Sequence, residues 1–332
     1  MAEPPQKTLI RAHAGKLILG AAAVLLVFVF TVMLANYRFP SFFEPSPAPR
    51  PGLTGWVFTE TLIDVGDQMF DNWLPNDLLW PTVFLDNPQN FQMGELRMLN
   101  YTVLRLKDNL SRLRSSDNQD PDCTQAYTLL NNDPKKWIFP SAESRFRLAM
   151  EHLKKYRDNL EKNQARFSPR ADNLTELLTD YVSQLGALNY ELAQAPKELR
   201  LKSVYPAAPK SQVPAGESQP PAPAAAPPEA KAPVQTPYSR VDNNFYQAQG
   251  AAYVLRQMMA AIRIEFKDVL EVKKAGELAD DIIQTLDQSQ FEPWIVLNGD
   301  VGSLTANHSM ELHSILENAR QKIYNLIEML SQ

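Results

Sequence analysis

Apolar residues recur at alternating intervals of three and four along most of the chain that follows residue 90. The clearest runs begin at Leu96, Phe146, Leu174, Phe245 and Leu312. This spacing places the apolar side chains on one stripe of an α-helix and leaves the charged residues on the other face. No alternating strand pattern longer than a few residues accompanies the runs. The pattern predicts an all-α protein whose long helices form an up-and-down helical bundle.

Helix start signals agree with these runs. Ser141, Pro169 and Asp242 each lie just before an apolar stripe, as residues at or near a helix N-terminus do. Weaker helices are expected at 55–72, 122–131 and 272–289. The regular spacing also leaves open a coiled-coil seam with a second copy, above all in the helix that begins near Phe245.

The most apolar stretch is 17–35, "LILGAAAVLLVFVFTVMLA", which carries no charge. It is long enough to cross a hydrocarbon core of ~30 Å at a rise of ~1.5 Å per residue. Lys7, Arg11 and Lys16 precede it, and aromatic residues from Tyr37 to Phe43 follow it. The positive flank predicts that residues 1–16 are a cytoplasmic tail and that everything after the transmembrane helix is extracytoplasmic.

A cleaved signal peptide is the alternative interpretation of 17–35. Its apolar region would span only ~7–15 residues and end in a small-x-small cleavage site. Met33 and Ala35 make a poor cleavage pair, so an uncleaved signal anchor is expected. The chain has one cysteine, Cys123, and hence no intramolecular disulfide. These features suit a single-pass protein of the bacterial inner membrane with its C-terminal domain in the periplasm.

Two proline-rich segments divide the exported part. Residues 36–54 are expected to form a stem that lifts the domain off the membrane. Residues 206–238 form a Pro/Ala-rich insertion with too few large apolar side chains to fold, so disorder is predicted. A spacer or a Pro-motif ligand remains possible there, but a tolerated insertion is favoured. The helical bundle would then have two parts, 55–205 and 239–332.

The charge balance argues against nucleic acid as a partner. The net charge is −5, and residues 1–38 contribute +3, which leaves −8 for the remainder. Binding to phosphates needs clustered Lys and Arg side chains, because they release the condensed counterions. The expected contacts are therefore the lipid bilayer, through 17–35, and an envelope protein or a second copy of the chain.

Few residues carry recognisable chemistry, and we nominate no catalytic, metal-binding or cofactor-binding residue. His308 and His313 are five residues apart, whereas two metal ligands on one helix face are usually three or four apart. No nucleophile elbow, S-x-x-K pair or Gly-rich phosphate loop is present. The loop 298–313 gathers Asp300, Ser303 and Ser309 around His308, but Gly turns followed by a helix cap at Asn307 or Ser309 explain it more simply.

The densest mixture of rings and backbone-breaking residues is "DNWLPNDLLWP", residues 71–81. Pro75 forces Leu74 out of helical geometry, and Asn76 or Asp77 could cap a turn at 77–80 that Pro81 ends. The region 71–91 is thus expected to be a folded corner. Its rings would plug one end of the bundle; they are Trp73, Trp80, Phe84 and Phe91.

A ligand site in this corner is the competing interpretation. Trp73, Asp77, Trp80 and Asp86 are the candidate contacts to a ligand or partner. Acidic side chains beside exposed tryptophan rings would suit a sugar, a peptide or a cation.

The stretch "DNWLPNDLLWPTVFLDNPQNFQMGELRMLNYTV" resembles an uncharacterised bacterial family of single-pass inner-membrane proteins, catalogued as domain of unknown function 2333. The resemblance extends over the anchor and both helical parts. It implies one N-terminal anchor, a mostly helical body and no assigned activity, so it supplies no catalytic residues.

Two functional hypotheses follow. The first is a non-enzymatic single-pass envelope protein whose periplasmic helical domain serves protein interaction or scaffolding. The second is a periplasmic enzyme or binding protein that acts on cell-wall material through a cleft formed by 71–91 and 298–313. The second requires these two segments to lie together in space. A sensor domain is a weaker third possibility, because the short cytoplasmic tail would need a separate signalling partner.

Overall fold

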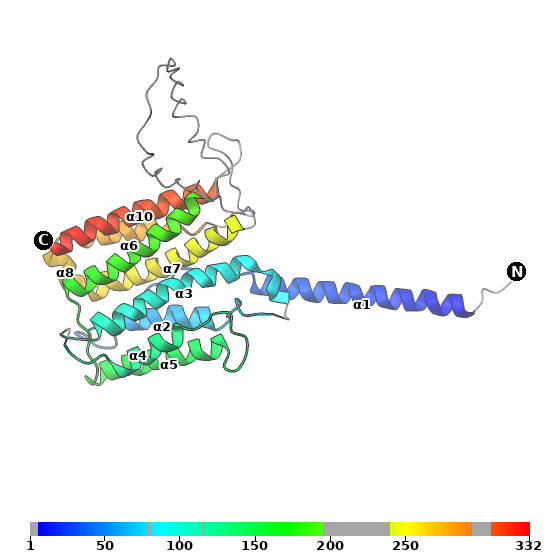
Figure 1. Cartoon of the computed structure of the whole chain (residues 1–332), viewed down its shortest axis with the longest axis horizontal. Coiled ribbons are helices and arrows are strands. Elements are labelled where there is room, and N and C mark those ends of the chain that lie inside the picture. Colours follow the sequence, from blue (N-terminus) through cyan, green and yellow to red (C-terminus); the bar gives the residue numbers. More distant parts are fainter. Residues whose placement is uncertain (1–5, 79–80, 115, 195–239, 292, 294–306) are drawn as a thin grey trace, which may run out of the picture.

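Helices make up nearly all the regular structure of this chain (Figure 1). The computed structural model describes residues 6–78, 81–114, 116–194, 240–291, 293 and 307–332. The α-helices there are α1 (Gln6–Asn36), α2 (Trp56–Phe70), α3 (Asp86–Arg105), α4 (Pro121–Leu130), α5 (Ala142–Glu161), α6 (Ala171–Ala193), α7 (Val241–Glu265), α8 (Lys267–Val272), α9 (Gly276–Asp287) and α10 (His308–Ser331). A 3₁₀ turn, η1 (Pro81–Phe84), precedes α3, and a π-helical turn, η2 (Leu106–Leu110), extends it. The described residues contain no strand, which confirms the all-α prediction; the insertion at 206–238 lies outside them.

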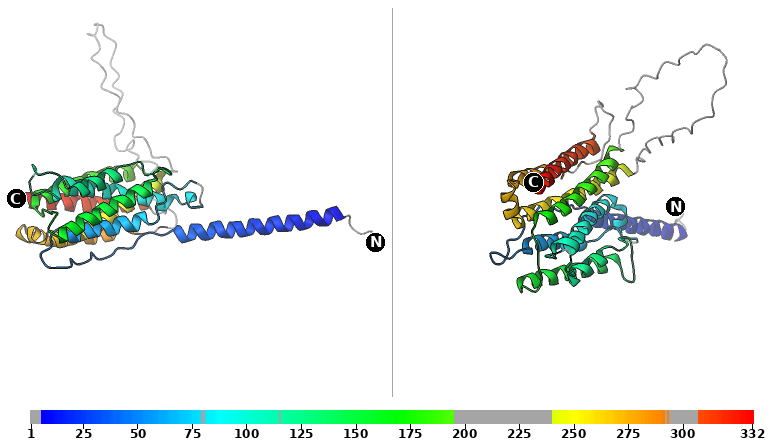
Figure 2. Two further views of the ribbon diagram at one scale, coloured as in Figure 1. Left: turned by 90° about the horizontal axis from the view of Figure 1, so that it is seen from below. Right: turned by 60° about the vertical axis from the view of Figure 1, so that its left-hand side comes forward.

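The long helices of the body lie side by side, and α1 projects away from one end (Figures 1 and 2). The central helix is α7, which packs most extensively on α3 and also contacts α2, α6, α9 and α10. On the outer sides α10 packs on α6, and α5 packs on α2 and α4. Because every residue of α7 from Ala248 to Ile262 is buried within one chain, its apolar pattern needs no second copy to explain it.

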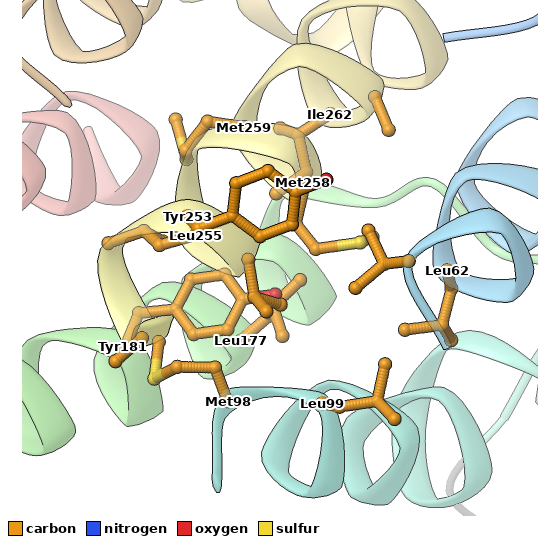
Figure 3. Close-up of a cluster of buried hydrophobic side chains, with 14 of the residues drawn as sticks. Leu62, Met98, Leu99, Leu177, Tyr181, Tyr253, Leu255, Met258, Met259 and Ile262 are labelled. Atoms are coloured by element: carbon orange, nitrogen blue, oxygen red, sulfur yellow. The ribbon is translucent and has the colours of Figure 1, made fainter. Parts of the chain in front are cut away.

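The apolar stripes meet in a core between α2, α3, α6 and α7 (Figure 3). Leu99 and Met98 of α3 face Tyr253 of α7 and Tyr181 of α6 there. The Tyr181 hydroxyl and Thr102 Oγ1 are 2.8 Å apart, so this buried phenol is hydrogen-bonded inside the core. The α3 stripe ends one step earlier than expected, since Leu113 follows η2 and is 41% exposed.

Two glycines bring the backbones of α3 and α7 into contact. A Cβ atom on Gly94 would lie 1.9 Å from the carbonyl oxygen of Gln247. A Cβ on Gly250 would lie 1.9 Å from the carbonyl oxygen of Phe91. No side chain fits at such distances in a close-packed interior, so both positions require glycine. The sequence analysis gave no weight to either residue.

The proline-rich segment after α1 lies along the body. Residues 37–54, here called the strap, join α1 to α2. Their contacts advance along α7 in order: Phe39 stacks on Tyr246, Phe42 stacks on Tyr253, the Phe43 carbonyl accepts a hydrogen bond from Gln257 Nε2, and the adjoining Gly55 N–H donates to Glu265. The segment expected to be a stem thus lies against the body, because its apolar side chains gain burial there.

The helix ends follow the expected signals in part. Ser141 caps α5 by accepting a hydrogen bond from Ser144 N–H. The weak helix at 55–72 is α2, and that at 122–131 is α4. The helix expected at 272–289 is α9, which begins at Gly276 because Lys274 adopts a left-handed conformation (φ 53°) between α8 and α9.

Within the described part of the chain, α1 supplies one segment long and apolar enough to cross a membrane, Lys16–Asn36. No residue in the most apolar part of this segment is buried against the body.

Candidate functional site at the junction of α1 and the body

The end of the body from which α1 projects is called the α1 end. Five segments meet there: the first residues of the strap, the corner after α2, the loop 131–141 between α4 and α5, the start of α3 and the start of α7 (Figure 1). Polar side chains connect α1 to the corner and to α3. Asn72 Nδ2 donates to Asn36 Oδ1 at 2.9 Å, and Asn87 Nδ2 donates to the Tyr37 hydroxyl at 3.3 Å. The last turn of α1 is thus fixed to the body.

Trp73 closes the core at the α1 end. Its ring is buried and packs edge-on against Phe146 at 5.2 Å. Its indole N–H donates to the Pro134 carbonyl at 3.0 Å, and the neighbouring Asn76 Nδ2 donates to the Lys136 carbonyl. The corner after α2 and the loop 131–141 therefore hold each other in place. These contacts account for Trp73 as a core residue.

The other candidate residues of the corner have different surroundings. The Asp77 carboxylate accepts a hydrogen bond from Thr82 Oγ1, and Asp86 is exposed in the first turn of α3. Trp80 lies outside the described residues. Trp73 is buried, so the two described carboxylates differ from it in exposure.

The helical turn of the corner is displaced from its expected position. Pro81 begins the turn η1, whereas the sequence analysis has Pro81 end a turn at 77–80. Proline suits the first position of a helical turn, because its missing N–H would have no partner there and its φ is already helical. Phe91 is buried as expected, but Phe84 is 71% exposed, so its assignment to the plug is wrong.

Large apolar side chains are exposed together at the α1 end. They form two groups, one on the corner beside α1 and one on the loop 131–141. We call their set the α1-end patch; it comprises Leu78, Val83, Phe84, Trp137, Ile138 and Phe139. Turn η1 contacts α1 directly, and Phe139 is 90% exposed. Lys135 and Lys136 are exposed beside the second group. The patch thus combines rings, aliphatic side chains and cations.

A pocket of about 430 Å³ lies between α1, the strap, α2 and α3. The last residues of α1 and the strap residues Arg38 and Phe39 form one wall. Gln68, Gln92 and Glu95 line it from α2 and α3. We call it the junction pocket. Its volume is within the ~300–1,000 Å³ that small-molecule sites occupy.

Glu95 is the unusual group in the junction pocket. Glu95 is only 3% exposed, and this burial raises the pKa of its carboxyl well above the ordinary value. Within the described residues no hydrogen bond or ion pair reaches this carboxyl. A buried carboxyl without donors costs free energy, because its water contacts are not replaced.

The neighbouring polar groups are bonded to each other. The Tyr253 hydroxyl donates to Gln68 Oε1 at 2.7 Å. Gln92 Nε2 donates to the Asn72 carbonyl at 2.7 Å, and Gln92 Oε1 accepts from Leu74 N–H at 2.9 Å. These groups hold the pocket walls together and leave the carboxyl of Glu95 unpartnered among the described residues.

The start of α10 lies at the same end of the body as the corner. A series of ring contacts connects them: Phe91 with Phe39, Phe39 with Tyr246, Tyr246 with Phe245, Phe245 with Phe291, and Phe291 with His308. The Asn307 side chain accepts from Met310 N–H, which confirms the expected cap. His313 Nδ1 lies 3.1 Å from the Asn189 carbonyl. Asp300 and Ser303 lie outside the described residues. Among the described residues, no group of three potential metal ligands occurs.

The sequence analysis missed Glu95, Arg38 and Gln68. Glu95 sits beside Leu96, at the start of an apolar stripe, and next to Gly94. An acid between a glycine and a core leucine could have marked a buried carboxyl. No local pattern predicts that Arg38 and Glu95, so distant along the chain, line one pocket.

The comparisons with known proteins give one match. A family model described as "Uncharacterized protein conserved in bacteria (DUF2333)" matches residues 44–332. No curated protein and no solved structure matches the chain.

Proposed function

The chain belongs to the DUF2333 family of uncharacterised bacterial proteins, and we propose that it is a non-enzymatic single-pass protein of the bacterial inner membrane. Its N-terminus is cytoplasmic and its helical body is periplasmic. The body binds or scaffolds other envelope components at the membrane surface, with the α1 end as the part in contact with the bilayer.

The α1-end patch carries this proposal. An apolar helix projects from one end of the body (Figure 2), and the exposed rings and aliphatic side chains of the patch belong to that same end. Aromatic rings beside lysines are typical of residues at the interface between hydrocarbon and water. In water these side chains would form an unfavourable exposed apolar surface. Contact with lipid relieves that cost.

The orientation follows from the flanks of α1. Lys7, Arg11 and Lys16 precede the apolar segment, and positive charges favour the cytoplasmic side. The hydrogen bonds of Asn36 and Tyr37 to the corner leave no free linker between α1 and the body. The junction pocket then lies at the level of the lipid headgroups.

A periplasmic enzyme acting on cell-wall material is the second candidate. Its condition is that 71–91 and 298–313 lie together, and the described residues 307–313 are at the same end of the body as the corner. In the described residues the two segments do not bring a nucleophile beside a general base. We keep it as an alternative that a cell-wall hydrolysis assay of the purified full chain would test.

Reporter fusions test the topology. Alkaline phosphatase fused after Gln332 should be active in cells, because this enzyme folds only in the periplasm, and green fluorescent protein at the same position should be dark. The reverse pattern would overturn the proposed orientation.

Fluorescence quenching tests the contact with lipid. Brominated lipids should quench part of the tryptophan emission of the full chain in nanodiscs. Trp137→Phe should remove much of the quenched emission, because Trp137 lies in the α1-end patch. Trp56→Phe is the control, since Trp56 is at the opposite end, where its indole N–H donates to Glu161. Equal quenching in the wild type and Trp137→Phe would contradict the seating of this end on the bilayer.

A further inference from the structure

The position of Glu95 is fixed by the crossing of α3 and α7. Glu95 follows Gly94, whose backbone touches α7, and a Cβ on Gly250 would lie 3.1 Å from the Glu95 backbone nitrogen. The helix therefore cannot rotate here to carry the carboxyl into solvent. The carboxyl stays at the wall of the junction pocket, and a partner for it has to enter that pocket.

The partner must donate several hydrogen bonds. An ionised carboxylate accepts at two oxygens and has no hydrogen to donate. A primary ammonium offers three N–H donors and a positive charge, so it can satisfy a buried carboxylate by itself. A quaternary ammonium carries the same charge but has no N–H. The chemistry of Glu95 thus selects a primary amine over a trimethylated one.

Arg38 adds the opposite charge to the same pocket. It lies two residues after the end of α1, its side chain is exposed, and no hydrogen bond or ion pair ties its guanidinium to another described residue. A guanidinium binds phosphate oxygens through two parallel N–H donors. Phe39, Phe91 and Met69 supply apolar surface to the same pocket. The lining therefore suits a zwitterion with an amine and a phosphate.

The place of the pocket identifies the source of that zwitterion. The apolar segment ends at Asn36, and the pocket is lined by Ala35, Asn36 and the first residues of the strap. A lipid whose chains lie along α1 would present its headgroup at this level. We propose that the junction pocket binds a phospholipid with a phosphate and a primary ammonium, in which Glu95 contacts the ammonium and Arg38 contacts the phosphate. This assignment deepens the proposed function and rests on it.

Lipid retention by the full chain tests the assignment. The protein would be purified from mixed vesicles of phosphatidylethanolamine, phosphatidylcholine and phosphatidylglycerol, and its bound lipids counted by native mass spectrometry. Phosphatidylethanolamine should be enriched over both others. Glu95→Gln should lower that enrichment at least about tenfold, the loss expected for a hydrogen bond to a charged group. Arg38→Gln should instead lower the retention of all three lipids by about the same factor, because each of them carries the phosphate. Glu277→Gln and Arg114→Gln, at exposed sites outside the pocket, should leave the enrichment unchanged.

Three outcomes would overturn the assignment. One is equal retention of phosphatidylethanolamine and phosphatidylcholine by the wild type. Another is a Glu95→Gln variant that melts like the wild type and keeps its phosphatidylethanolamine. The third is binding of free phosphoethanolamine as tightly as the lipid, which would identify a soluble ligand. These results leave the reporter-fusion pattern untouched, so loss of this assignment is distinguishable from loss of the proposed topology.

Discussion

Each end of the helical body shields a glutamate from solvent, Glu95 fully and Glu265 in part, and the two make different contacts. At the end opposite α1, the Glu265 carboxylate accepts backbone N–H groups of Gly55, Val57 and Phe58 and so caps the start of α2. At the α1 end, Glu95 receives no such donor from the described residues. Burial raises the pKa of both carboxyls. The carboxylate of Glu265 thus caps a helix of the fold, whereas the carboxyl of Glu95 has no hydrogen-bond partner among the described residues.

The surfaces of the two ends also differ, because polar pairs cover one and exposed rings lie on the other. Charged and polar pairs close the far end: Trp56 Nε1 donates to Glu161, and Arg50 donates to the Glu161 carbonyl at 2.6 Å. The α1 end is closed internally by rings around Trp73 and externally leaves Phe84 and Phe139 uncovered. The far end also exposes apolar side chains, Ile264 and Val272, so the difference between the ends lies in the exposed rings of Phe84, Trp137 and Phe139.

The largest expected loss of stability comes from Gly94→Ala, at the contact between α3 and α7. The added Cβ would meet the Gln247 carbonyl at 1.9 Å, so α3 and α7 must separate and the junction pocket must open. We expect a loss of about 3 kcal/mol or more, a large part of a typical total of ~5–15 kcal/mol. Thermal melting followed by circular dichroism checks it.

Gly186→Ala is the matched control. The nearest atom to its added Cβ would be Arg320 Nη1 at 3.8 Å, which is ordinary contact. Since alanine favours the helix over glycine, a gain of ~0.5–1 kcal/mol is expected. A Gly94→Ala variant as stable as the wild type would refute the backbone crossing.

The strap connects the two ends, and Phe42→Ala weakens it at its middle. Phe42 stacks on Tyr253 at 5.7 Å and lies under the Arg256 guanidinium at 4.7 Å. Removing a partly buried ring should cost ~2–3 kcal/mol and expose residues 37–54 to proteases. Limited proteolysis measures the second effect. Ser41→Ala serves as the control, because its side chain is exposed and makes no hydrogen bond within the described residues, and its carbonyl is retained. Equal cleavage of the two variants would argue against a packed strap.

At the far end, Glu265→Ala should cost ~1–2 kcal/mol, because the first N–H groups of α2 lose their acceptor. Glu265→Gln keeps one oxygen and should cost less. Glu277→Ala, at an exposed position of α9, is the control for the loss of a glutamate. If the melting temperatures of Glu265→Ala and Glu277→Ala coincided, the capping role would be disproved.

The smallest effect, and one of opposite sign, is expected for Glu95→Gln in lipid-free detergent. Since burial raises the pKa of the folded carboxyl, the unfolded chain releases this proton at lower pH than the folded chain does. Stability contributed by the protonated group is complete below the ordinary pKa and declines as pH rises above it. The variant should therefore melt above the wild type at pH 7.5 and together with it at pH 4. A lower melting temperature at pH 7.5 would show that Glu95 is already partnered.

The sequence predicted the fold class because stripes such as Leu96 to Leu110 can be satisfied only by helices packed on one another. It did not reveal the packing of the strap on the body, for a physical reason. Proline content indicates the lack of a helix, but the stacking of Phe39 and Phe42 depends on where α7 places Tyr246 and Tyr253.

The candidate site was only partly predictable. The turn chemistry around Pro75 identified a corner, and the ring of Trp73 is buried as one of the two interpretations required. The ligand interpretation of the corner stays untested. Glu95 went unnoticed because its burial results from a glycine pair 156 positions apart, Gly94 and Gly250, which no local pattern reveals.

The course of the strap has a mechanical consequence. α1 leaves the body at one end, but the chain that follows it enters α2 at the other. A pull on α1 would therefore be directed along the strap and parallel to α7. Its ring stacks and the hydrogen bonds of the Phe43 carbonyl would be loaded together in shear instead of being peeled apart one at a time. An attachment loaded in this way would resist tension on α1 better than one whose contacts break in sequence.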